Sequence, residues 1–76
     1  MSSNGVSDAD ERLRTLVHDI RTPLTIITGF CELLERQHDT LTQEQRDEYQ
    51  RRIKAAAGEM SQILDRERDE RLSREL

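Results

Sequence analysis

The sequence predicts an all-α protein: an antiparallel helical hairpin that pairs with a second copy to form a four-helix bundle. The first observation is a repeat of apolar residues spaced alternately four and three positions apart, the period of a helix seam. It runs through Leu13, Val17, Ile20, Leu24, Ile27, Cys31 and Leu34. After a short polar interval, a second such repeat runs through Tyr49, Ile53, Ala56, Met60 and Ile63. Two amphipathic helices with a short connection are expected to lie antiparallel.

The first helix is expected over about residues 8–36. Residues 1–6 form a small polar leader, which we expect to be disordered. Ser7 is a suitable N-cap, and the acidic residues just after it suit the positive end of a helix dipole. The hairpin domain is therefore predicted to span residues 7–66.

The second helix is expected over about residues 43–66. It follows a connection at residues 37–41, and Thr42 and Gln45 have the spacing of a capping box, in which each side chain bonds the backbone N–H of the other residue. In residues 67–76 the same repeat would bring acidic side chains to the core. We therefore expect these residues to form a charged helical extension that leaves the bundle packing and frays.

The composition indicates a small domain with little material for a core. The chain has 76 residues, of which 33% are hydrophobic, with one Tyr, one Phe and no Trp. A single hairpin of this composition buries too little apolar surface to offset the entropy lost on ordering it. Two hairpins that share one core would bury both seams, which predicts a homodimer.

Charge and hydropathy exclude several classes of protein. The net charge is −4 and 37% of the residues are charged, so no basic surface is available for a nucleic-acid backbone. The apolar-rich stretch 24–34 is far shorter than the ~20 residues that cross a bilayer, and no signal peptide is recognisable. We expect a cytoplasmic chain with no membrane segment. The single cysteine, Cys31, is expected to be a buried structural thiol, and no metal or cofactor site is predicted.

Titratable chemistry is concentrated around His18, Asp19 and Thr22. His18 lies just outside the apolar seam, with Thr22 on the same face one turn later, so the imidazole is expected to reach solvent. Pro23 lacks a backbone donor and crowds the carbonyl of Asp19, which predicts a bend in the first helix. Imidazole, with an ordinary pKa of about 6.5, keeps a lone pair near neutral pH and can act as a nucleophile. The same pattern also fits a bent surface helix whose histidine has no chemical role.

The run from Leu16 to Leu24, LVHDIRTPL, resembles the H-box of the dimerisation and histidine phosphotransfer (HisKA-type) domain of two-component sensor histidine kinases. In that family the pattern His-(Glu/Asp)-x-x-(Thr/Asn)-Pro-Leu recurs. The resemblance covers roughly residues 8–66, and nothing in the chain resembles the asparagine- and glycine-rich boxes of the ATP-binding domain. It implies a member of the histidine kinase family that should not autophosphorylate alone. ATP and Mg²⁺ are then expected on a separate catalytic domain, acting in cis or in trans.

The resemblance also implies a role for each residue of the motif. His18 would attack the γ-phosphoryl group through Nε2, and Asp19 would orient and activate the ring as general base. Thr22 would orient the water that removes phosphate from a response regulator, although its hydroxyl can instead bond back to the carbonyl of His18. A response-regulator receiver domain would dock below the histidine on the stripe formed by Thr25, Ile26, Gly29, Phe30 and Leu33.

Several of these residues also have simpler interpretations. A bundle helix often buries a wide face, so Phe30 can be part of the core, whereas Ile26 and Leu33 are expected to point outward. Arg21 can pair electrostatically with a phosphate, although an exposed arginine is more often only a solvated charge. His38, at the predicted helix end, is expected to contact the C-terminal dipole rather than to take part in chemistry.

Two functions from different classes remain open at this point. In the first, the chain is the phosphoacceptor and dimerisation domain of a histidine kinase and passes phosphate from His18 to a response-regulator aspartate. In the second, it is a stand-alone adaptor, phosphotransfer or phosphatase module that binds response regulators without kinase activity. A helical dimerisation module with a silent His18 is a third, simpler interpretation.

Overall fold

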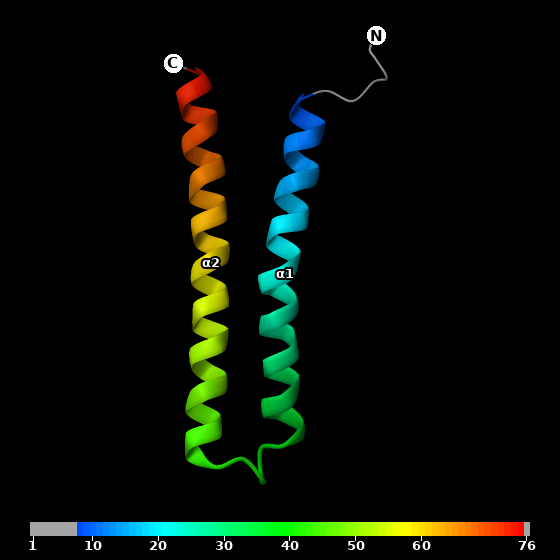
Figure 1. Ribbon diagram of the computed structural model, residues 1–76, viewed down its shortest axis with the longest axis vertical. Helices are drawn as coiled ribbons and strands as arrows, with labels where there is room; N and C mark the ends of the chain where they lie inside the picture. The colour runs from blue at the N-terminus through cyan, green and yellow to red at the C-terminus, as the bar shows by residue number, and fades with distance from the viewer. Residues whose placement is uncertain (1–7, 76) are drawn as a thin grey trace.

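A computed structural model describes residues 8–75 and shows two helices joined by a short loop (Figure 1). Helix α1 spans Asp8–Arg36 and helix α2 spans Gln43–Glu75. The helices are antiparallel, so the start of α1 and the end of α2 lie at the same end of the molecule. The predicted all-α hairpin is therefore confirmed. The expected leader and the Ser7 cap lie outside the described residues.

Helix α2 is longer than the apolar repeat indicates. It continues through the charged residues after the repeat, for which the sequence predicts a fraying helical extension, and ends at Glu75. Its last part is rich in oppositely charged side chains at helical spacing, which sustain an exposed helix without core packing. Within residues 8–75, neither helix has a stretch long and apolar enough to cross a membrane.

The loop end of the hairpin is fixed by local hydrogen bonds. The backbone N–H of Thr42 donates to Gln45 Oε1 at 2.9 Å, and the backbone N–H of Gln45 donates to Thr42 Oγ1 at 3.0 Å. This reciprocal pair is the capping box that the sequence predicts. Arg46 also donates from Nη2 to the backbone carbonyl of His38 at 3.1 Å. The first turn of α2 is thereby tied to the end of α1.

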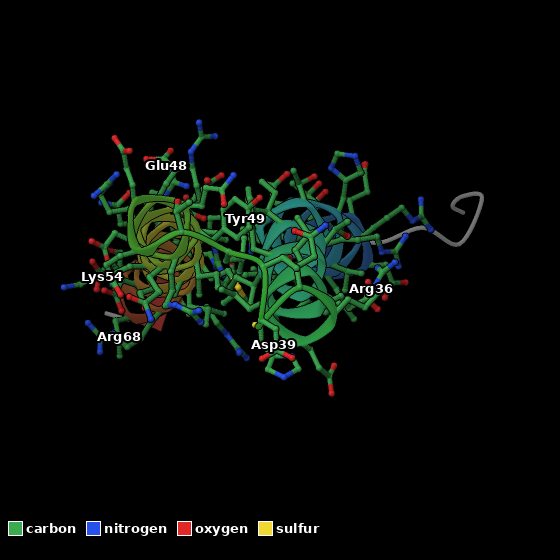
Figure 2. The ribbon with its side chains drawn as sticks, turned by 90° about the horizontal axis from the view of Figure 1, so that it is seen from below. Arg36, Asp39, Glu48, Tyr49, Lys54 and Arg68 are labelled. Carbon is green, nitrogen blue, oxygen red and sulfur yellow. The ribbon has the colours of Figure 1, made fainter. Side chains whose placement is uncertain are left out.

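The seam predicted for α2 is the side of that helix with the least exposure. Ala56 and Ile63, at 4% and 8% exposure, are the buried hydrophobic residues of the described chain. The other predicted positions are half-buried, namely Tyr49, Ile53 and Met60. Figure 2 shows Tyr49 between the two helices, and its ring lies 5.2 Å from that of Phe30, centroid to centroid. The apolar repeat of α2 is therefore confirmed.

The apolar seam predicted for α1 is only partly buried in a single hairpin. Three of its members are half-buried, namely Ile20, Ile27 and Leu34. Four are exposed, namely Leu13, Val17, Leu24 and Cys31. The expectation of a buried thiol at Cys31 is therefore wrong for the hairpin on its own. The reason is geometric, because one partner helix can cover only one stripe of α1 and the predicted seam spans two stripes.

Pro23 lies inside α1 and is fully buried. The helix remains continuous through it, although the proline ring crowds the preceding turn. Figure 1 shows the blue-to-cyan half of α1 leaning away from α2, so that the helices spread toward the termini. Residues of both helices line hollows between the spread ends, among them Arg12 and Glu67.

Candidate functional site

His18 lies on the outer surface of α1, in the half of the helix that precedes Pro23. Its side chain is 80% exposed. The half-buried neighbours Leu16 and Ile20, two positions to either side, mark the inner side of the helix. Because residues two positions apart point to different sides of a helix, His18 is turned toward solvent. The predicted exposure of this imidazole is confirmed.

The ring of His18 has one engaged nitrogen and one free nitrogen. Nδ1 lies 3.3 Å from Asp19 Oδ1, and the side chain of Asp19 is itself 48% exposed. An ionised carboxylate only accepts hydrogen bonds, so this contact places the proton of the neutral ring on Nδ1 and the lone pair on Nε2. Within residues 8–75, Nε2 has no hydrogen-bond partner. The ring nitrogen without a partner therefore faces solvent.

Thr22 is exposed one turn after His18 on the same side of α1. Its hydroxyl makes no hydrogen bond to the carbonyl of His18 or to any other described residue. The back-bonded arrangement considered from the sequence is therefore not observed. The hydroxyl is available to a water molecule or a reacting group near His18.

A shallow hollow surrounds His18 on the outer face of α1. It is lined by Asp10, Leu13, Arg14, Val17, His18 and Arg21. Arg14 and Arg21 stand one turn before and one turn after the histidine. Arg14 was not singled out by the sequence motif, because it precedes the H-box pattern. Its signal is the spacing of four residues from His18, which places both side chains on one helix face.

The stripe predicted to bind a partner is brought only partly to the surface. Thr25 is exposed and Ile26 is 39% exposed, whereas Phe30 and Leu33 are half-buried. The expectation that Leu33 points fully outward is wrong, because the loop half of α1 packs more of its surface against α2. Open space surrounds the position where Gly29 would carry a side chain. The exposed part of the stripe therefore consists of Thr25 and Ile26, with open space above the half-buried Gly29.

No arrangement of three or more His, Cys, Asp or Glu side chains in residues 8–75 could hold a metal ion. The acids near His18 are spread along the helix. Asp19 contacts Nδ1, and Asp10 stands two turns away at the edge of the hollow. The chemistry of the described site is thus that of an imidazole with a carboxylate beside it.

The fold and the site together define a helical hairpin domain with a solvent-facing histidine that contacts a carboxylate. The family model of the His Kinase A (phospho-acceptor) domain matches residues 9–71. The match covers both helices and includes His18, and it extends beyond the stretch covered by the sequence resemblance. The chain belongs to this family, whose members are the phosphoacceptor and dimerisation modules of histidine kinases in two-component signalling. Comparisons with curated proteins and with solved structures give no match.

Proposed function

We propose that His18 is the phosphoacceptor of this chain, carrying a phosphoryl group from ATP to an aspartate of a response-regulator receiver domain. ATP and Mg²⁺ are held by a separate catalytic domain. The observation that carries the proposal is the state of the ring, in which Asp19 engages Nδ1 and Nε2 faces solvent. This state leaves the nucleophilic lone pair accessible to a second protein.

In the first step, Nε2 of His18 attacks the γ-phosphorus of ATP. The new P–N bond forms as the bond to the bridging oxygen breaks, and ADP leaves with that electron pair. The ring becomes positively charged in this step, and Asp19, 3.3 Å from Nδ1, accepts the Nδ1 proton or stabilises the charge. Asp19 is thus the general base and the group that orients the ring.

In the second step, a carboxylate oxygen of the receiver aspartate attacks the phosphorus. The P–N bond breaks, an acyl phosphate forms, and the imidazole recovers a proton at Nδ1. Exposure of 80% at His18 allows the in-line approach that phosphoryl transfer requires. Thr22, one turn away with an unbonded hydroxyl, is positioned to orient water when the phosphorylated receiver is hydrolysed instead.

The receiver docks on the loop side of His18. Thr25 and Ile26 form the exposed part of this surface, and open space at the half-buried Gly29 allows close approach of a partner. Phe30 and Leu33 support it from their half-buried positions and set the spacing between the helices. Apolar surface next to a reactive group is typical of a site that binds a protein partner.

A second copy of the chain covers the exposed stripe of α1. Leu13, Val17 and Leu24 are 59%, 47% and 48% exposed, and they follow one another on one helix face. Leu64 of α2 is 50% exposed. It lies on the side of α2 that meets Leu13, because Arg71, two turns later, lines the same hollow as Leu13. Burial of these side chains in a four-helix bundle supplies the core that one hairpin lacks.

The test uses a receiver domain phosphorylated beforehand with a small-molecule phosphodonor. Mixing it with the chain should place an acid-labile phosphate on His18, and the His18→Gln variant should take none. The chain with ATP alone should stay unmodified until a HisKA-linked ATP-binding domain is added. Faster loss of receiver phosphate without label on His18 would favour the phosphatase module instead. Sedimentation should show a dimer for the native chain and a monomer for Leu24→Glu.

A further inference from the structure

We propose that Arg14 and Arg21 form a cationic clamp that binds the phosphoryl dianion while it is carried on Nε2 of His18. The inference rests on the proposed function, since it concerns the phosphorylated state of the same histidine. It adds a binding role for Arg14, which lies outside the H-box pattern, and it pairs that residue with Arg21 across the histidine.

The two arginines bracket the histidine along the helix. Arg14 precedes His18 by four residues and Arg21 follows it by three, so all three side chains lie on one face of α1. They line the same hollow. Both arginines are exposed, and neither has a hydrogen-bond or ion-pair partner among residues 8–75. Two guanidinium groups are thus available at the place where the phosphoryl group arrives.

Side-chain direction brings the guanidinium group of Arg21 toward the ring, and the ring toward Arg14. In an α-helix the Cα–Cβ bonds tilt toward the N-terminus, so each side chain covers the turn that precedes it. The imidazole of His18 therefore leans over the turn of Arg14, and Arg21 leans back toward the turn of His18. A group on Nε2 thus lies over the turn of Arg14, within the hollow that both arginines line.

The remaining charges around the hollow do not cancel the clamp. Asp10 is the acid that lines it, and Asp10 lies two turns from His18, farther than either arginine. Asp19 contacts Nδ1 and not Nε2, the nitrogen that would carry the phosphoryl group. No residue of α2 lines this hollow. A phosphoryl group on Nε2 thus lies between two cations, with Asp19 at the other ring nitrogen and Asp10 two turns away.

Arginine suits this role because its planar fork donates two parallel hydrogen bonds to phosphate oxygens. Before transfer, the clamp would attract the anionic donor to Nε2. After transfer, it would hold the dianion and slow its loss to water. Both effects weaken as salt screens the charges, with a screening length of about 10 Å at 0.1 M ionic strength.

The experiment phosphorylates the full chain with phosphoramidate, which removes the need for a catalytic domain. Nε2 attacks phosphorus, the P–N bond of the reagent breaks with loss of ammonia, and the Nδ1 proton passes to Asp19 or solvent. The rate on His18 and the half-life of the product are followed by mass spectrometry and ³¹P NMR. We expect Arg14→Gln and Arg21→Gln each to lower the rate about two- to fivefold, as for loss of one exposed charge contact.

The matched control is Arg68→Gln, which removes the same charge from α2. Figure 2 shows Arg68 pointing outward from α2, away from α1. This variant should react like the native chain. Arg14→Lys should restore most of the rate, because lysine binds phosphate as a point charge. The rate on native His18 should also fall with added NaCl more steeply than that of Arg14→Gln.

The possible failures are distinguishable. Equal rates, half-lives and salt dependences for the native chain and Arg14→Gln would overturn the clamp and leave His18 as phosphoacceptor. An equal loss in Arg68→Gln would also overturn it, because the effect would then be one of net charge. A native chain that takes no phosphate on His18, from phosphoramidate or from a phosphorylated receiver, would overturn the proposed function and the clamp together.

Discussion

The dipeptide His-Asp occurs twice in this chain, and the two copies have different surroundings. In the middle of α1, His18 contacts Asp19 through Nδ1 at 3.3 Å, and its Nε2 has no partner in residues 8–75. Just past the end of α1, His38 uses both ring nitrogens. Its Nδ1 lies 3.1 Å from the carbonyl oxygen of Glu35 and its Nε2 lies 3.2 Å from Asp39 Oδ1.

The difference follows from position along the helix. The last carbonyls of a helix lack backbone partners, so a histidine there turns a nitrogen toward them. Both ring nitrogens of His38 therefore face an oxygen atom. Inside α1 the carbonyls are already bonded, which leaves His18 with Asp19 alone. The same dipeptide therefore gives a helix-end contact in one place and a ring with one free nitrogen in the other.

Removal of the carboxylate should give the largest difference between the two His-Asp pairs, measured as the rate of phosphorylation of His18. Asp19→Asn should slow phosphorylation of His18 by a separate ATP-binding domain about 100-fold, the lower end of the range for general-base catalysis. Asp39→Asn should leave that rate unchanged. Initial rates of acid-labile labelling measure both. Equal rates in native chain and Asp19→Asn would show that the carboxylate has no part in the transfer.

Much of the fold was predictable because it depends on local rules. The capping box of Thr42 and Gln45 follows from backbone donors that only nearby side chains can satisfy. The repeat of α2 gives its buried side, including Ala56 and Ile63, because a helix of known period can turn only one stripe inward. The exposure of His18 follows from its position just outside the apolar seam of α1.

The rest depends on packing that a periodicity does not specify. The repeat in α1 merges two stripes, one facing α2 and one left open, so Leu24 and Cys31 are exposed where a single core was expected. Burial of Pro23 and stacking of Phe30 on Tyr49 depend on how the helices approach each other. Arg14 precedes the H-box pattern, and the shape of the surface places it in the His18 hollow.

A smaller effect is expected in the reactivity of the two rings. Diethyl pyrocarbonate acylates an unprotonated ring nitrogen, so it should modify His18 about fivefold faster than His38. That factor corresponds to about 1 kcal/mol for a hydrogen bond broken first at His38. Asp39→Ala should narrow the gap by releasing Nε2, and peptide mapping by mass spectrometry measures both rates. Faster reaction at His38 in the native chain would contradict the assignment of the free nitrogen to His18.

The stability of the loop that holds His38 should depend more on the capping hydroxyl of Thr42 than on the hydroxyl of Thr40. Thr42→Ala removes the acceptor for the backbone N–H of Gln45 and should lower the free energy of unfolding by about 1 kcal/mol. Thr40→Ala removes only a bond to the carbonyl of Gln37 and should cost less than about 0.5 kcal/mol. Urea unfolding at one protein concentration compares them, since association adds to stability. Equal losses would mean that the capping box does not secure this end.

The smallest effect concerns pH and should be confined to the loop half of the molecule. Hydrogen bonds from Arg51, at 2.6 Å, and Arg52, at 2.8 Å, hold the pKa of Glu48 below its ordinary value of 4.5. Because the folded pKa is the lower one, the stabilisation is complete above 4.5 and is lost as the pH falls through the folded pKa. Tyr49, the one tyrosine in a chain without tryptophan, reports unfolding of this half by fluorescence. Glu48→Gln should flatten the acid limb of stability slightly, while the reactivity of His18 at neutral pH stays the same. An unchanged acid limb in Glu48→Gln would show that solvent screens these exposed pairs completely, and a change at His18 would show that the two halves are coupled.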